Sequence, residues 1–280
     1  MSKKLTFRNR HKIPVVLLTI ALLVIMLFPF FVMLSTMLKK STAIYVRPPY
    51  WIPREFAWDN FVRVWSEYYL LQYFNNSVLV GLGTTILNAI VIIPAAYSIA
   101  RFKFKGRSVI LYSLLAMQMF SPVIIIISLF RVFIKLQLLD KLIGLILANT
   151  VITLSFTTWL MYGYFSSIPG EIEDAARIDG CSRMGTLTLI MIPIAAPGLV
   201  TAMIYTFIQA WNDFLFPLSF INAQKKMPLT LGIYQFVGRW ATQWEMLNVA
   251  AFIALIPVLV LFFIIEKQLV AGLAGGAVKG

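Results

Sequence analysis

The uncharged run IPVVLLTIALLVIMLFPFFVMLSTML, at residues 13–38, decides the fold class of this chain. A bilayer has a hydrocarbon core about 30 Å thick, which a helix of about 20 apolar residues can cross. The run exceeds that length and contains no Asp, Glu, Lys or Arg. It therefore predicts a helix that spans a membrane.

A cleaved signal peptide is the alternative explanation for an apolar run after a basic start. The apolar core of a signal peptide has about 7–15 residues, far fewer than this run. No small-x-small cleavage motif follows, and the bulky segment Phe28-Pro29-Phe30-Phe31 lies within it. We therefore expect the run to remain as the first transmembrane helix.

Further stretches are also long and apolar enough to cross a bilayer. The six predicted spans are residues 13–38, 77–100, 108–130, 142–164, 193–221 and 246–265. No internal repeat or low-complexity linker separates them, so residues 1–280 are predicted to form a single transmembrane domain. The predicted fold class is an all-α integral membrane protein with six transmembrane helices.

The composition argues against a soluble protein. Hydrophobic residues make up 60% of the chain and charged residues 12%, whereas soluble domains carry about 25% charged residues. The net charge of +13 comes from Lys and Arg beside apolar runs, which favours lipid headgroups over nucleic acid. The lone Cys181 excludes an intrachain disulfide and a thiolate metal site, and His11 stands alone in a basic tail.

Basic residues in short loops predict the orientation of the spans. Five of the first twelve residues are Lys or Arg, and residues 101–107 carry four more. A hairpin of the first two spans places both basic segments on the cytoplasmic side. Six spans then place the two termini and residues 166–192 there. The segments 39–75 and 222–245, rich in Trp and Tyr or in basic residues, are predicted to lie outside.

The segment between the fourth and fifth spans predicts a short helix. Pro169 suits a first helical position. Glu171, Glu173 and Asp174 fall in the first turns, where the helix dipole favours acids. Glu173 and Arg177 form an i,i+4 pair in the favourable order. A helix therefore starts near Pro169.

A turn and a second helix are expected after it. Gly180 is a natural stop for the first helix, and Ser182 suits the cap of a helix from residue 183 to 192, ended by Pro193. Ala175 and Ala176 leave a low-relief patch that another surface can approach. Composition alone favours an ordinary solvated connecting loop.

The order of residues in this segment resembles the EAA loop of permease subunits of ATP-binding-cassette importers. That pattern is Glu-Ala-Ala, a short spacer, Gly, a longer spacer and Pro. It matches Asp174-Ala175-Ala176, Asp179-Gly180 and Ile190-Met191-Ile192-Pro193. The flanking Ser167-Ile168-Pro169 is similar to the carbohydrate-uptake branch. Asp174 replaces the usual Glu, which keeps the acid but shortens its reach.

The resemblance extends over nearly the whole chain, through Trp58-Asp59-Asn60-Phe61, Trp211-Asn212-Asp213 and the tail at residues 272–280. It implies that the loop is a cytoplasmic helix-turn-helix that couples the spans to a separate ATPase. The residues implied in this coupling are Glu171, Glu173, Asp174, Ala175, Ala176, Arg177, Asp179, Gly180 and Pro193.

The resemblance also implies a permease subunit of a bacterial inner membrane that binds no cofactor or metal. Its implied partners are two ATPase subunits that bind ATP and Mg, a second related permease, and an extracytoplasmic solute-binding protein. The implied solute is a carbohydrate, either an oligosaccharide or a sugar derivative. The chain contains no Gly-x4-Gly-Lys-Ser/Thr phosphate loop, so ATP hydrolysis is expected on a partner.

Polar residues in the spans are candidates for a translocation path. Asp213 lies within a predicted span, where an acid is a functional candidate. A hydrated or paired acid near the outer end of the span is an equal alternative. The other candidates are Gln209, Asn212, Asn88, Gln118 and Asn149, and interhelical hydrogen bonds explain most of them equally well.

A secondary transporter or channel is the main alternative function. Such a protein typically carries several intramembrane charges, matched broken helices or paired repeats, whereas this chain has one candidate acid and no visible repeat. A membrane-embedded enzyme would need a catalytic constellation that is missing here. A purely structural subunit would not need the EAA-like segment.

Overall fold

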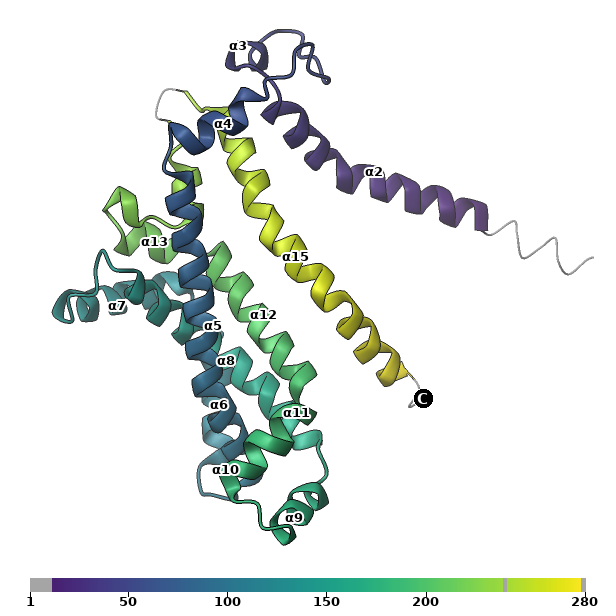
Figure 1. Ribbon diagram of the computed structural model, residues 1–280, viewed down its shortest axis with the longest axis vertical. Helices are drawn as coiled ribbons and strands as arrows, with labels where there is room; N and C mark the ends of the chain where they lie inside the picture. Colours follow the sequence, from purple (N-terminus) through teal and green to yellow (C-terminus); the bar gives the residue numbers. More distant parts are fainter. Residues whose placement is uncertain (1–11, 239–240, 278–280) are drawn as a thin grey trace, which may run out of the picture. The chain divides into compact units, whose positions relative to one another are not determined.

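The computed structural model describes residues 12–238 and 241–277, which form helices joined by loops (Figure 1). Four of these helices are long and apolar enough to cross a membrane. Two bent helix pairs raise the number to six if each pair is one span. The all-α membrane fold class is thereby confirmed, whereas the count of six spans stays a prediction. The basic tail at residues 3–11 lies outside the described residues.

Backbone contacts divide the chain into two compact units. The larger unit comprises Tyr69–Tyr234 and the residues from Ala254 on. The smaller unit comprises the residues up to Tyr68 and Gln235–Ile253. The assignment of residues 1–280 to a single permease domain stays a prediction.

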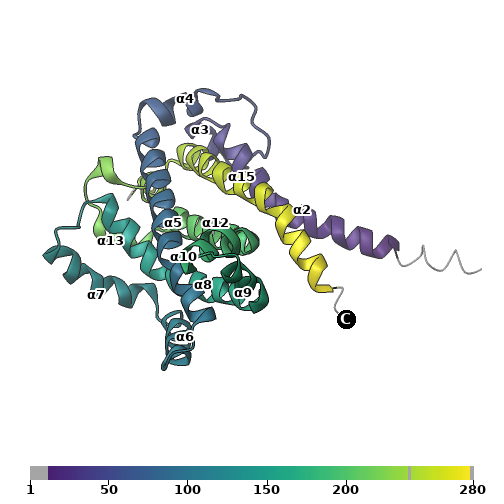
Figure 2. The ribbon, with the colours of Figure 1, turned by 60° about the horizontal axis from the view of Figure 1, so that its bottom comes forward.

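Three long helices form the centre of the larger unit (Figures 1 and 2). They are α5 (Leu70–Arg101), α8 (Leu142–Ser167) and α12 (Ala196–Asn212), and each contacts the other two. A Cβ atom on Gly81 of α5 would lie 2.7 Å from the Phe207 ring of α12, so glycine permits this close approach. Small residues serve the same purpose in membrane helix pairs generally.

The predicted third span, residues 108–130, is two helices and not one. α6 (Arg107–Met117) and α7 (Pro122–Lys135) meet at an angle of 102°. Ser121 is extended because a residue before proline is disfavoured in the α region, and its Oγ accepts the Val123 N–H at 3.4 Å. Pro122 therefore starts a new helix. By contrast, Pro94 lies inside the continuous α5.

The predicted fifth span, residues 193–221, is not a single helix either. A helical stretch of α10 (Arg183–Thr186), the π-helical η1 (Leu187–Met191) and α11 (Ile192–Ile194) turns by 80° into α12. α12 ends at Asn212 because Asp213 is extended. The Asp213 carboxylate accepts the N–H groups of Leu215 and Phe216 at 3.1 and 3.3 Å, which starts α13 (Leu215–Phe220).

Asp140 joins the loop before α8 to the segment after α13. Its carboxylate accepts the backbone N–H groups of Asn222 and Ala223 at 2.6 and 2.8 Å. These bonds, chiefly the one from Ala223, lower the pKa of Asp140 below its usual value. Two short helices, η2 (Gln224–Lys226) and α14 (Leu229–Tyr234), follow this junction.

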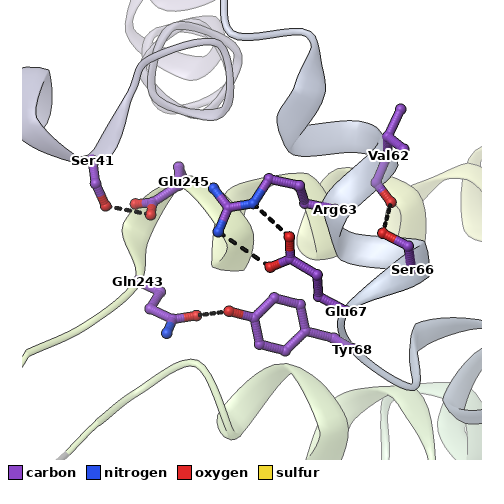
Figure 3. Close-up of polar contacts among 8 residues, drawn as sticks. All are labelled: Ser41, Val62, Arg63, Ser66, Glu67, Tyr68, Gln243 and Glu245. Atoms are coloured by element: carbon purple, nitrogen blue, oxygen red, sulfur yellow. Dashed lines mark hydrogen bonds and ion pairs between the residues drawn. The ribbon is translucent and has the colours of Figure 1, made fainter.

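The smaller unit contains α2 (Lys12–Met37), α3 (Ser41–Ile44), α4 (Asp59–Ser66) and the start of α15 (Trp244–Ala277). Polar contacts join its two chain segments (Figure 3). The Ser41 hydroxyl donates to the Glu245 carboxylate, and the Tyr68 hydroxyl donates to the Gln243 side chain at 2.8 Å. Parts of the two predicted outer segments are therefore held together.

Candidate functional site

A helix, a turn and a second helix connect α8 to α12 (Figure 1). α9 (Gly170–Ile178) starts after an extended Pro169, which precedes the helix and does not occupy its first position. The Gly180 backbone is left-handed, with φ +86°, and ends α9. The Ser182 Oγ accepts the Gly185 N–H at 3.1 Å and caps α10. These are the stop and the cap expected from the sequence.

α9 has one buried edge and a broad exposed surface. Glu173 and Ala176, three residues apart, are 4% and 3% exposed. Pro193, in α11, is exposed. The other coupling residues expected from the sequence are also exposed: Glu171, Asp174, Ala175, Arg177, Asp179 and Gly180. The exposed surface therefore carries three acids beside one arginine.

Ala176 does not belong to an exposed low-relief patch, contrary to the expectation from the sequence. Of the two alanines only Ala175 is exposed. Residues three positions apart lie on the same face of a helix, so Ala176 is buried on the same face as Glu173. Its small side chain lets α9 approach its own protein, and only Ala175 is open to a partner.

Glu173 meets two arginines and a tyrosine. The guanidinium of Arg101, the last residue of α5, forms an ion pair with Glu173 Oε1. The Tyr97 hydroxyl donates to Glu173 Oε2 at 3.4 Å, and Arg177 Nη2 lies 3.9 Å from the same oxygen. Arg101 Nη2 also donates to the Ile168 carbonyl at 2.8 Å. α9 is thereby connected to the ends of α5 and α8.

An apolar cluster lies at the same ends of the long helices. It includes the buried side chains of Tyr97, Phe165, Ile168, Leu187 and Met191, from α5, α8, the residue after α8, and η1. The Tyr97 and Phe165 rings meet edge to face, with centroids 5.8 Å apart. The cluster packs η1 against the long helices, while polar contacts connect α9 to them.

Polar residues of the spans are used largely in contacts between helices. Asn88 of α5 is 1% exposed and donates to the Thr153 hydroxyl of α8 at 2.6 Å. The Thr157 hydroxyl donates to Asn88 Oδ1 at 3.0 Å. Asn149 Nδ2 donates to Asp213 Oδ2 at 3.0 Å. Asp213 is therefore a paired acid that also caps α13.

The remaining path candidates lie apart from these contacts. Gln209, Asn212 and Gln118 are exposed. Gln118 lines a cavity of about 190 Å³ at the bend between α6 and α7, together with Ser155 and Tyr205. The structure does not gather the candidates into one polar path.

Sequence reasoning missed two features of this region. The Arg101–Glu173 contact joins residues far apart in the chain, and the sequence indicates only the general basic character of residues 101–107. The Asp140 junction was missed because an acid after a span resembles any loop acid. A left-handed backbone at Asp140, φ 56°, is a conformation that Asp tolerates well.

Residues 92–271 match the family model described as binding-protein-dependent transport system inner membrane component. The chain is 36% identical over 259 residues to a sulfoquinovosyl glycerol transport system permease protein, SmoH, of Agrobacterium fabrum, covering 92% of this chain and 91% of SmoH. It is 31% identical to a trehalose/maltose transport system permease protein, MalG, of Thermococcus litoralis, covering 93% and 94% of the two chains.

A solved structure has a similar fold. It is the crystal structure of a bacterial ABC transporter involved in the import of the acidic polysaccharide alginate. One of its chains superposes with a TM-score of 0.81 at 21% identity, covering 95% of this chain and 98% of the other.

Proposed function

Because the chain belongs to the family of binding-protein-dependent transport system inner membrane components, we propose that it is the permease subunit of an ATP-driven carbohydrate importer. It crosses a bacterial inner membrane several times and hydrolyses no ATP itself. Two separate ATPase subunits supply the energy, and they bind ATP and Mg. A second related permease and an extracytoplasmic binding protein complete the assembly.

The exposed surface of α9 is the observation that carries this proposal. It presents Glu171 and Asp174, with Asp179 at its C-cap, outside the long apolar helices, on an element joined to α5 by Glu173. Exposed acids suit a basic or polar groove on a partner. When ATP closes the ATPase pair, the groove displaces α9, and the displacement passes to the spans.

The proposed class of solute is inferred from the transport systems of similar permeases. Permeases similar to this chain belong to transport systems for sulfoquinovosyl glycerol and for trehalose and maltose. A sugar, an oligosaccharide or a sugar derivative is therefore the proposed cargo. The exposed Gln209 and Asn212 are proposed path residues, since amide side chains hydrogen-bond sugar hydroxyls.

An ATP hydrolysis assay tests the proposal that partner subunits, and not this chain, hydrolyse ATP. The purified chain should hydrolyse no ATP. Its complex with the ATPase subunits and the second permease should hydrolyse ATP faster when solute-loaded binding protein is added. Hydrolysis by the chain in isolation, at a rate above that of a mock purification, would refute the proposal.

Orientation is the second part of the proposal, with both termini and α9 in the cytoplasm. In a Cys181→Ser background, Gly170→Cys reports on α9, because a Cβ there meets nothing within 4 Å. Ser66→Cys in α4 reports on the outer side, since Ser66 is exposed. An impermeant maleimide should label the Ser66 variant in intact spheroplasts and the Gly170 variant only after lysis. Labelling of Gly170→Cys in intact spheroplasts would contradict this orientation.

A further inference from the structure

The ion pair between Arg101 and Glu173 is buried at the edge of the coupling helix. The two side chains are 14% and 6% exposed. Arg101 Nε and Glu173 Oε1 face each other, and neither atom has a hydrogen bond to any other described residue. Solvent hardly reaches the two groups, so Arg101 is the main compensation for the Glu173 charge, with the Tyr97 hydroxyl and the more distant Arg177 at the other carboxylate oxygen.

Glu173 is placed differently from the other acids of α9. Glu171, Asp174 and Asp179 are exposed and can touch a partner, whereas the Glu173 carboxylate points into its own protein. A separate ATPase subunit cannot reach Glu173 while α9 stays in place. Its role must be exerted within this chain.

α9 is too short to be stable as an isolated helix, so it depends on contacts with the rest of the protein. It has nine residues, and isolated helices shorter than about 12–15 residues are marginal in water. Its buried edge consists of Glu173 and Ala176, and only Glu173 reaches the end of α5 with a charged group. The Arg101 guanidinium also binds the Ile168 carbonyl, which fixes it against the end of α8.

We propose that Arg101 and Glu173 form a charge lock, which fixes α9 to the cytoplasmic end of α5 so that the two helices move together. This inference rests on the proposed function and assigns a positioning role to two residues that do not touch solute or nucleotide. A displacement of α9 by the ATPase then reaches α5 directly. Without the charge lock, the ATPase moves α9 but the spans do not move with it.

The test uses Glu173→Met, Arg101→Met and the double variant. Removing one partner leaves an uncompensated buried charge, whereas replacing both by apolar side chains is often tolerated. Glu67→Met is the matched control, because it breaks an ion pair with Arg63 whose side chains are about half exposed. Glu173→Gln, which keeps the size of the side chain, serves if Glu173→Met does not accumulate.

The first measurement is hydrogen–deuterium exchange of residues 172–178 in the purified chain in nanodiscs. Both single variants should exchange about tenfold faster than the parent, and the double variant should return towards the parent rate. Glu67→Met should leave this exchange unchanged. Parental exchange in either single variant, or summed effects in the double variant, would overturn the charge lock.

The second measurement is solute uptake per ATP hydrolysed in the assembled importer. The single variants should retain hydrolysis but lose about tenfold in this ratio, with recovery in the double variant. If the parent importer transports and the single variants keep its ratio, the charge lock is wrong while the proposed function stands. If the parent chain gives no ATP-dependent uptake, the proposed function fails, and the exchange data still decide whether the lock exists.

Discussion

Replacement of Ala176 by Trp should strongly reduce ATP-dependent uptake while the protein reaches the membrane at normal levels. Ala176 is 3% exposed on the buried edge of α9. A large side chain there cannot fit beside the protein and forces α9 outward, at a cost of about 1–3 kcal/mol for overpacking. The spans keep their own packing, so insertion is unaffected. Uptake should fall by about tenfold or more.

The matched control for this variant is Ala176→Ser, which adds one oxygen and should retain most of the uptake. Membrane levels are measured by immunoblot and uptake with a radiolabelled sugar in whole cells. Parental uptake by Ala176→Trp at a normal membrane level would show that transport does not require α9 to keep its packed position. That result would restore the interpretation of residues 169–192 as a solvated connecting loop.

Replacement of Gly180 by Val should also strongly reduce uptake, for a reason that lies in the backbone. Gly180 has φ +86°, and a Cβ on it would meet nothing within 4 Å. The space is open, so the penalty is conformational, about 1–3 kcal/mol for a β-branched residue. The turn between α9 and α10 should change shape, and α9 should no longer meet its partner in register.

Two further variants separate this effect from general strain. Gly180→Asn should retain much of the uptake, because Asn tolerates the left-handed region. Gly106→Val introduces the same backbone penalty in the loop after α5, where φ is +94° and the space is also open. It should affect uptake less than Gly180→Val, because it leaves the α9–α10 turn intact. Equal losses in both valine variants would contradict a special role for the turn.

Sequence patterns predicted the membrane fold because apolar length is a local property. Residues 13–38, 77–100 and 142–164 correspond to helices that were recognised from composition alone. A single helix was wrongly expected where a proline or a polar residue locally ends one helix and starts another inside an apolar run. Pro122 starts α7 after a 102° bend, and Asp213 ends α12 by capping α13. A hydropathy pattern does not distinguish a straight span from two helices that meet at an angle.

The candidate site was only partly predictable for a similar reason. Gly180 and Ser182 carry local signals for a stop and a cap, and both occur where they were expected. The inward direction of Ala176 depends on which face of α9 packs against the protein. The partner of Glu173 was assigned as Arg177 from spacing, whereas the contact made by Arg101 requires the fold.

Solute uptake into reconstituted vesicles shows whether this chain is a permease subunit driven by separate ATPase subunits. The vesicles contain this chain, its second permease and the ATPase subunits, with loaded binding protein on one side and ATP on the other. Labelled sugar should accumulate only when ATP, the ATPase subunits and the binding protein are all present. Uptake that persists without the ATPase subunits, or that follows an ion gradient in the absence of ATP, would contradict it.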